Sequence, residues 1–236
     1  MLNLIGSITG LATIAVNLVA MSTILDLSLA KRLGLAAIVG AWVGLASGLG
    51  ASGALQFSPA SPAPLIGIVA ATAPLVVGAL ALASRGFRSA LMAIPTSLLI
   101  GLNSMRILGV MFLFLALEGR LAGPFPFSAG IGDIVTGVFA IPLAIAVANS
   151  RSLPTAAIAR WNWFGSLDLV VAIFLGLTSA NGAPVQLIHW GVGSQAMQEL
   201  PFCLIPTVLV PSYLITHVIV AAQLAARRPV ATLSHA

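Results

Sequence analysis

The chain has 236 residues, of which 59% are hydrophobic and only 6% are charged. Because a soluble domain is about one quarter charged, this composition excludes a protein that covers itself with a polar surface, and it predicts an integral membrane protein with the lipid bilayer as its main partner. The net charge of +5 comes from short basic clusters between apolar runs. That pattern is typical of membrane-protein loops, so we do not expect nucleic acid as a partner. The single cysteine, Cys203, excludes an intrachain disulfide.

Seven segments are apolar over roughly the 20 residues that a helix needs to cross a bilayer. We therefore predict an all-α, polytopic membrane protein with seven transmembrane helices in a single domain over residues 1–225. The tail at 226–236 is expected to be disordered and cytoplasmic. The predicted spans are 2–25, 33–56, 64–84, 89–117, 129–149, 160–179 and 201–225.

The basic residues between these spans predict an orientation. If seven helices alternate in direction, four pairs of basic residues fall on one side of the membrane and Arg120 alone falls on the other. Positive charge gathers on the cytoplasmic side of membrane proteins, so the N-terminus is expected outside and the C-terminus inside. The four pairs are Lys31 with Arg32, Arg85 with Arg88, Arg151 with Arg160, and Arg227 with Arg228.

The second predicted span repeats small residues at every fourth position, including Gly40, Gly44 and Gly48. Side chains this small let a neighbouring backbone approach closely, which favours helix packing along this face. Packing inside the protein is the first interpretation. A homodimer seam, or contact with a larger membrane complex, is the alternative. The first span carries Asn17 on a face of small and polar residues.

Charged residues inside the apolar spans indicate a buried polar site. Arg106 lies within the fourth span, Asp133 within the fifth and Asp168 within the sixth, while His217 lies within the seventh. Ionisable groups at this depth are costly in lipid, so each needs a partner or a function. Two further polar residues share faces with them: Asn103 with Arg106, and Tyr213 with His217.

Depths along the spans predict how these residues are arranged. At about 1.5 Å per residue, Arg106 lies near the midplane and Asp133 about 10 Å closer to the outer surface. Asp168 and His217 are expected at one level nearer the inner surface. The sequence therefore predicts a polar column with three levels, in which Arg106 and Asp133 do not form one closed pair.

Three functions use this column. Our leading interpretation is transport of a small, anionic solute with protons as the coupling ion, in which Arg106 holds the anion and Asp168 with His217 passes the proton. The second is a membrane-embedded enzyme that acts on a lipid-like substrate. The third is a structural subunit of a larger membrane complex. A static salt-bridge network would use the same residues without any of these activities.

The letters Gly130-Ile131-Gly132-Asp133 resemble the GxGD signature of intramembrane aspartyl proteases, with Asp168 as a second aspartate. Two such carboxylates would share a proton. In presenilin-like and prepilin-peptidase-like enzymes, however, the GxGD aspartate is the second of the pair, whereas here it comes first. The expected separation of about 10 Å in depth also argues against a shared proton. The other interpretation is that these glycines allow tight packing where the helix begins.

Common cofactors lack their ligands in this sequence. Haem held by two histidines needs a second buried histidine beside His217. Retinal needs a buried lysine, and Lys31 lies in a loop. A zinc site at His217 and Asp168 lacks a third ligand. We therefore expect neither a cofactor nor a metal.

One resemblance extends over residues 100–220. The pattern resembles uncharacterised bacterial integral membrane proteins of similar length, and it implies a location in the bacterial inner (plasma) membrane without implying a function. The residues that carry it are Arg106, Gly119-Arg120-Leu121, Phe127, Gly130, Gly132-Asp133-Ile134, Gly165, Asp168, Pro206, Pro211 and His217.

Overall fold

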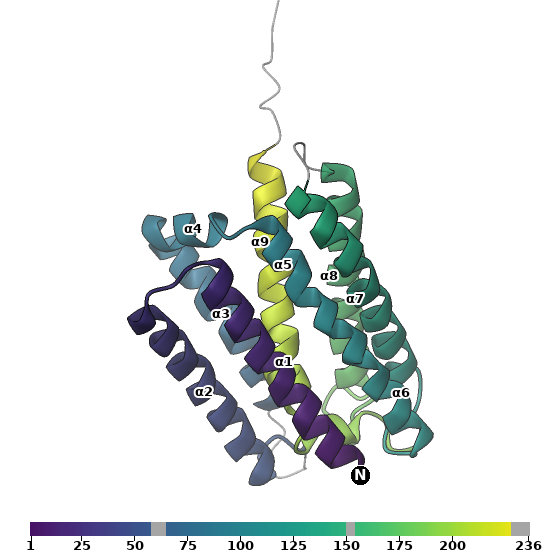
Figure 1. Ribbon diagram of the computed structural model, residues 1–236. Helices are drawn as coiled ribbons and strands as arrows, with labels where there is room; N and C mark the ends of the chain where they lie inside the picture. The colour runs from purple at the N-terminus through teal and green to yellow at the C-terminus, as the bar shows by residue number, and fades with distance from the viewer. Residues whose placement is uncertain (58–64, 150–153, 228–236) are drawn as a thin grey trace, which may run out of the picture.

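The fold is known from a computed structural model, which describes residues 1–57, 65–149 and 154–227. Over these residues the chain is all-α, with no strand, and the long helices run side by side (Figure 1). Seven helical segments are long and apolar enough to cross a membrane, which agrees with the predicted count. They are α1 (Leu2–Ile24), α2 (Leu29–Ala51), α3 (Leu65–Ala83), Thr96–Leu117, α7 (Phe125–Asn149), α8 (Thr155–Thr178) and Ile205–Ala226.

The fourth segment differs from the single helix expected at 89–117. A separate short helix, α4 (Arg85–Met92), begins after Ser84, whose hydroxyl accepts a hydrogen bond from the Phe87 amide. It ends before Pro95, because proline disfavours helical geometry in the preceding residue and has no N–H to donate. The span that follows has three parts: α5 (Thr96–Leu102), the 3₁₀ helix η1 (Asn103–Gly109) and α6 (Val110–Leu117).

Two later helices begin earlier than expected. Helix α7 begins at Phe125 rather than 129, and α8 begins at Thr155 rather than 160. Pro126 does not prevent this start, because the first turn of a helix has no intrahelical acceptor for its N–H groups. The last span opens with one π-helical segment, η3 (Ile205–Leu209), before α9 (Val210–Ala226).

The best-buried of the seven segments is Thr96–Leu117, which packs along α7. Helix α7 contacts α5, η1, α6 and α8, and α9 packs against α8, α3 and α5. Helices α1, α2 and α3 form the outer part of the bundle, and much of their apolar surface is exposed. Contact between this apolar surface and lipid chains carries no hydrophobic free-energy cost, whereas contact with water would be unfavourable.

The glycine face of α2 does not pack inside the protein. Added Cβ atoms at Gly40, Gly44 and Gly48 would meet no atom within 4 Å, so the expectation of intramolecular packing along this face is wrong. A different face attaches α2, where Ala46 is buried and the indole N–H of Trp42 donates to the Thr207 carbonyl at 2.9 Å. The small side chains at every fourth position indicated a contact face but not its partner.

Basic residues gather at one end of the bundle. The C-terminal end of α9 lies at the end opposite the N-terminus (Figure 1). Near the same end as the α9 C-terminus lie the start of α2, helix α4 and the start of α8, which carry Lys31, Arg32, Arg85, Arg88 and Arg160. Two of the predicted basic residues, Arg151 and Arg228, and most of the predicted disordered tail (228–236) lie outside the described residues.

Candidate functional site

Arg106 of η1 is fully enclosed, with a side chain that is 0% exposed. Its Nε donates to Asp133 Oδ1 of α7 at 2.7 Å, and its Nη2 donates to Asp168 Oδ2 of α8 at 2.6 Å. Charge-assisted hydrogen bonds of this length are the strong class of such contacts. One arginine therefore holds two aspartates from neighbouring helices.

The third nitrogen of Arg106 determines the protonation state and tautomer of His217. Arg106 Nη1 lies 3.2 Å from the Gly165 carbonyl oxygen and 3.0 Å from His217 Nε2. A guanidinium has donors only, so Nε2 must accept. The imidazole is then neutral with its proton on Nδ1, which donates to Asn162 Oδ1 at 2.9 Å. This tautomer follows from the hydrogen-bond partners.

We call Arg106, Asp133, Asp168, His217 and Asn162 the polar centre. With both aspartates ionised and the imidazole neutral, one positive and two negative charges leave a formal charge of −1. A buried ion pair normally balances its charges. The presence of two carboxylates on one guanidinium distinguishes this centre from a simple one-to-one salt bridge.

The secondary residues lie around the centre. The Arg106 guanidinium lies 5.7 Å from the centroid of the Tyr213 ring, within range of a cation–π contact. The Asn17 Oδ1 atom of α1 is buried and has no hydrogen-bond partner among the described residues. Asn103 belongs to a neighbouring contact, in which its amide donates to Thr216 Oγ1 at 2.9 Å. Asn103 is therefore close to Arg106 in the sequence, but its amide bonds to Thr216 and not to the guanidinium.

Three glycines allow the helices to approach around the centre. A Cβ at Gly132 would overlap the Asp168 carboxylate, and a Cβ at Gly109 would overlap Asp133. A Cβ at Gly165 would lie 2.7 Å from His217 Cε1, which is also too close. Gly132 of the GxGD letters therefore serves packing against Asp168, as the second interpretation of that motif expected.

The predicted three-level column is wrong, because Arg106 contacts both aspartates and His217 directly. Asp133 lies eight residues after the start of α7, about 12 Å from that end, and Asp168 lies ten residues before the end of α8, about 15 Å from the same end. The expected depths were wrong because α7 and α8 begin four and five residues earlier than predicted. The expected separation of about 10 Å in depth between Asp133 and Asp168 is wrong for the same reason. Among the described residues, the two carboxylates meet at the guanidinium rather than in a direct hydrogen bond.

Asn162 and the Gly165 carbonyl were missed by the sequence analysis. Asn162, Gly165 and Asp168 follow at intervals of three residues, so they lie on one face of α8. That spacing was a usable signal for Asn162. The Gly165 carbonyl had none, because a backbone acceptor inside a helix carries no mark in the sequence.

A small cavity of about 50 Å³ borders the centre and has room for a few water molecules. Arg106, Asp133 and Tyr213 line it, together with Gly10 and Thr13 of α1. The Asp133 side chain is 15% exposed, against 8% for Asp168. Asp133 is therefore the more accessible carboxylate. Among the described residues, no three His, Cys, Asp or Glu side chains are grouped to hold a metal ion.

Comparison with known proteins places the centre within one family. Residues 63–225 match a family described as a domain of unknown function (DUF8737). The matched range includes Arg106, Asp133, Asp168 and His217, while α1 and α2 lie outside it. No curated protein and no solved structure matches the chain.

Proposed function

The chain belongs to the DUF8737 family, and we propose that it is an integral membrane protein that transports a small anionic solute together with a proton. The observation that carries this proposal is that two carboxylates share one enclosed guanidinium. With both carboxylates ionised, the centre would carry a formal charge of −1. A single proton on either carboxylate would make the centre neutral, which low-dielectric surroundings favour.

The same geometry links the proton to the solute. Arg106 is occupied by Asp133, Asp168, Gly165 and His217, so it offers little to an anion in this state. Protonation of Asp133 would weaken its hold on Nε, and the guanidinium edge beside the small cavity would then attract an anion. The cavity volume of about 50 Å³ limits that anion to a few non-hydrogen atoms unless the helices separate.

The proposed orientation has the N-terminus outside and the C-terminus in the cytoplasm of a bacterial cell. The basic residues at the C-terminal end of the bundle support it, because cytoplasmic loops are enriched in lysine and arginine. A reporter enzyme that is active only in the cytoplasm is expected to be active when fused to the C-terminus. An inactive fusion of normal abundance would contradict this orientation.

Proton-coupled uptake can be measured in vesicles that contain the purified protein. Radiolabelled formate and acetate serve as probes, and an inward proton gradient is expected to raise the uptake of at least one of them. Asp133→Asn removes the titrating carboxylate and is expected to lower the gradient-driven uptake at least tenfold, a change of about 1.4 kcal/mol. Uptake that ignores the proton gradient would reject the coupling.

Asp26→Asn is a matched control for this measurement. Asp26 lies between α1 and α2 with a fully exposed side chain, and its φ of 45° suits asparagine as well as aspartate. Its uptake should equal that of the unmodified protein. Infrared spectra add a second measurement: a protonated carboxylic acid band should rise with falling pH and be lost in Asp133→Asn. A static salt-bridge network would show no such band while the protein stays folded.

The exposed glycine face of α2 supports a second copy or a larger membrane complex as a partner. Gly40, Gly44 and Gly48 leave room for another helix backbone to approach, which is the usual basis of helix association in lipid. The oligomeric state of the purified protein tests this partner. A monomer in native mass spectrometry would reject the homodimer.

A further inference from the structure

A line of contacting side chains leads from one end of the bundle to the small cavity beside Arg106. Phe202, which lies just before η3, lines this cavity together with Gly6 of α1. The guanidinium of Arg120 lies 5.1 Å from the centroid of the Phe202 ring and donates to Asn3 Oδ1 in the first turn of α1. The N-terminus and the end of α6 lie at this end of the bundle (Figure 1), which is the outer end in the proposed orientation.

Exposure to solvent decreases along this line. Asn3 is exposed and Arg120 is half-buried, whereas Phe202 is only 2% exposed. The ring fits closely against α1, because an added Cβ at Gly6 would lie 2.5 Å from Phe202 Cε1. One helical turn further, a Cβ at Gly10 would meet no atom within 4 Å, and Gly10 lines the cavity. The Phe202 ring therefore closes the cavity toward the outer end, with open space behind it.

Arg120 has no counter-charge at this end. Apart from Arg106, the other lysine and arginine residues that the structure describes lie at the opposite end of the bundle. In the described part of the chain, no carboxylate lies within ion-pair distance of Arg120. A guanidinium carries several N–H donors in a fork that matches a carboxylate, and the contact with Asn3 uses only one of its nitrogens. Arg120 can therefore bind an anion that arrives from the water at this end.

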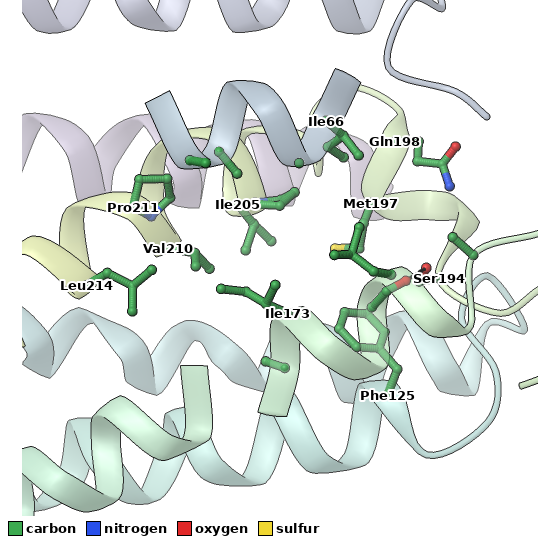
Figure 2. Close-up of a pocket in the computed structure, with 18 of the residues that line it drawn as sticks. Ile66, Phe125, Ile173, Ser194, Met197, Gln198, Ile205, Val210, Pro211 and Leu214 are labelled. Atoms are coloured by element: carbon green, nitrogen blue, oxygen red, sulfur yellow. Dashed lines mark hydrogen bonds between the residues drawn. The ribbon is translucent and has the colours of Figure 1, made fainter. Parts of the chain in front are cut away.

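The other route to the small cavity, from the lipid side, does not suit an anion. A larger cavity of about 380 Å³ lies between α3, α8 and α9 and shares Ile205 and Val210 with the small one (Figure 2). Its walls are almost entirely apolar, and no charged side chain is among the described residues that line it. Moving an ion from water to such walls costs far more than moving a neutral molecule. The route past Arg120 is therefore the one with a charge that favours an anion.

We propose that Arg120 captures the anion at the outer end and that Phe202 is the closed gate between Arg120 and the cavity beside Arg106. This path rests on the anion transport proposed above and adds the side from which the anion enters. The two arginines lie at its two ends, and one aromatic ring separates them. The anion is a small monocarboxylate such as formate or acetate, because the cavity of about 50 Å³ has room for only a few non-hydrogen atoms.

Labelling of an introduced thiol tests the gate without requiring transport. Thr13→Cys places the thiol in the small cavity, where Thr13 is 1% exposed, and Cys203→Ala removes the chain's single native cysteine. Phe202→Ala is expected to raise the labelling rate about tenfold, because an enclosed thiol otherwise reacts only when the structure opens. Phe202→Leu keeps more of the apolar volume and should give an intermediate rate, which preserves the test if the alanine variant does not fold.

Phe125→Leu is the matched control for the gate. Phe125 belongs to the same buried cluster as Phe202, but it does not line the small cavity. The control should label as slowly as the protein with both rings intact. Equal labelling rates in Phe202→Leu and Phe125→Leu would reject Phe202 as the gate.

Two labelling reagents of opposite charge test the capture of the anion. The probes are the sulfonatoethyl and trimethylammonium-ethyl methanethiosulfonates, applied to the purified protein in detergent. Arg120→Gln is expected to lower the rate with the anionic reagent about fivefold without lowering the rate with the cationic one, because a charge at an entrance steers ions. Arg88→Gln, at an exposed position of α4 at the opposite end, should change neither rate. An anionic rate that is unchanged in Arg120→Gln would overturn the proposal.

Uptake into vesicles separates capture from the later steps. Arg120→Gln is expected to raise the formate concentration for half-maximal uptake about fivefold, while the maximal proton-driven rate stays the same because Arg106 and Asp133 remain. A half-maximal concentration equal to that of the unmodified protein would reject capture by Arg120. Charge-dependent labelling without any proton-driven uptake would reject the proposed transport and keep Arg120 and Phe202 as the entrance to the cavity.

Discussion

Replacing Arg106 with glutamine is expected to lower the free energy of unfolding by about 3–5 kcal/mol, the usual cost of breaking a buried ion pair by removing one partner. The reason is that the enclosed guanidinium neutralises both Asp133 and Asp168, at 2.7 and 2.6 Å. Without it, two carboxylates from neighbouring helices would face each other inside the bundle. Unfolding of the purified protein in detergent, followed by circular dichroism, measures the loss.

Neutralising the partners should restore stability. Arg106→Gln combined with Asp133→Asn and Asp168→Asn leaves polar but uncharged groups, so the triple variant is expected to recover most of the loss. Since the three residues share hydrogen bonds, their effects should be strongly non-additive. An Arg106→Gln variant as stable as the unmodified protein would show that the centre contributes nothing to folding. A triple variant as unstable as the single one would reject the charge-based explanation.

Gly132→Ala is expected to lower stability by about 1–3 kcal/mol, the range for overpacking a filled site. The added methyl group would overlap the Asp168 carboxylate, so α7 and α8 must separate or Asp168 must leave Arg106. Anion uptake should fall with stability, because the centre is then distorted. The same unfolding and uptake measurements check both effects.

Gly44→Ala is the matched control, since it makes the same change in a helix where a Cβ meets no atom within 4 Å. Alanine is favoured over glycine inside a helix by up to about 1 kcal/mol, so this variant should be as stable as the unmodified protein or slightly more stable. A loss at Gly44 equal to that at Gly132 would contradict crowding at Asp168 as the cause, because helix propensity alone would raise the stability of both variants.

The polar residues could be predicted from the sequence because charge is rare in apolar segments. Arg106, Asp133 and Asp168 stand out in their spans, and these three, with His217, meet in the structure. Their levels could not be predicted, because hydropathy does not mark where a helix begins. The first turns of α7 and α8 contain proline or polar residues and were therefore predicted to be loops. In the structure they are helical, which lengthens α7 by four residues and α8 by five at their starts.

The glycines illustrate a second limit of the sequence. Gly132 and Gly44 carry the same letter in similar apolar surroundings, yet one contacts a buried carboxylate and the other faces outward. Spacing indicates that a helix face is small, but the partner of that face depends on how all helices assemble. Asn162 was missed for a different reason: an uncharged amide costs less than an ion in an apolar helix, so it marks a site less strongly, although its spacing from Asp168 was informative.

The 3₁₀ geometry of η1 also determines how α5 and α6 would move if the backbone around Arg106 changed its helical form. Seven residues span about 14 Å in a 3₁₀ helix but about 10.5 Å in an α-helix. Converting η1 to an α-helix would therefore shorten the fourth span by about 3.5 Å and turn one end against the other by about 140°. Such a screw motion would carry α5 and α6 in opposite senses about Arg106, which is the middle residue of η1. The arginine is thus placed where a change of helical pitch would displace it least, so its contacts with both aspartates would persist while the two ends of the segment move.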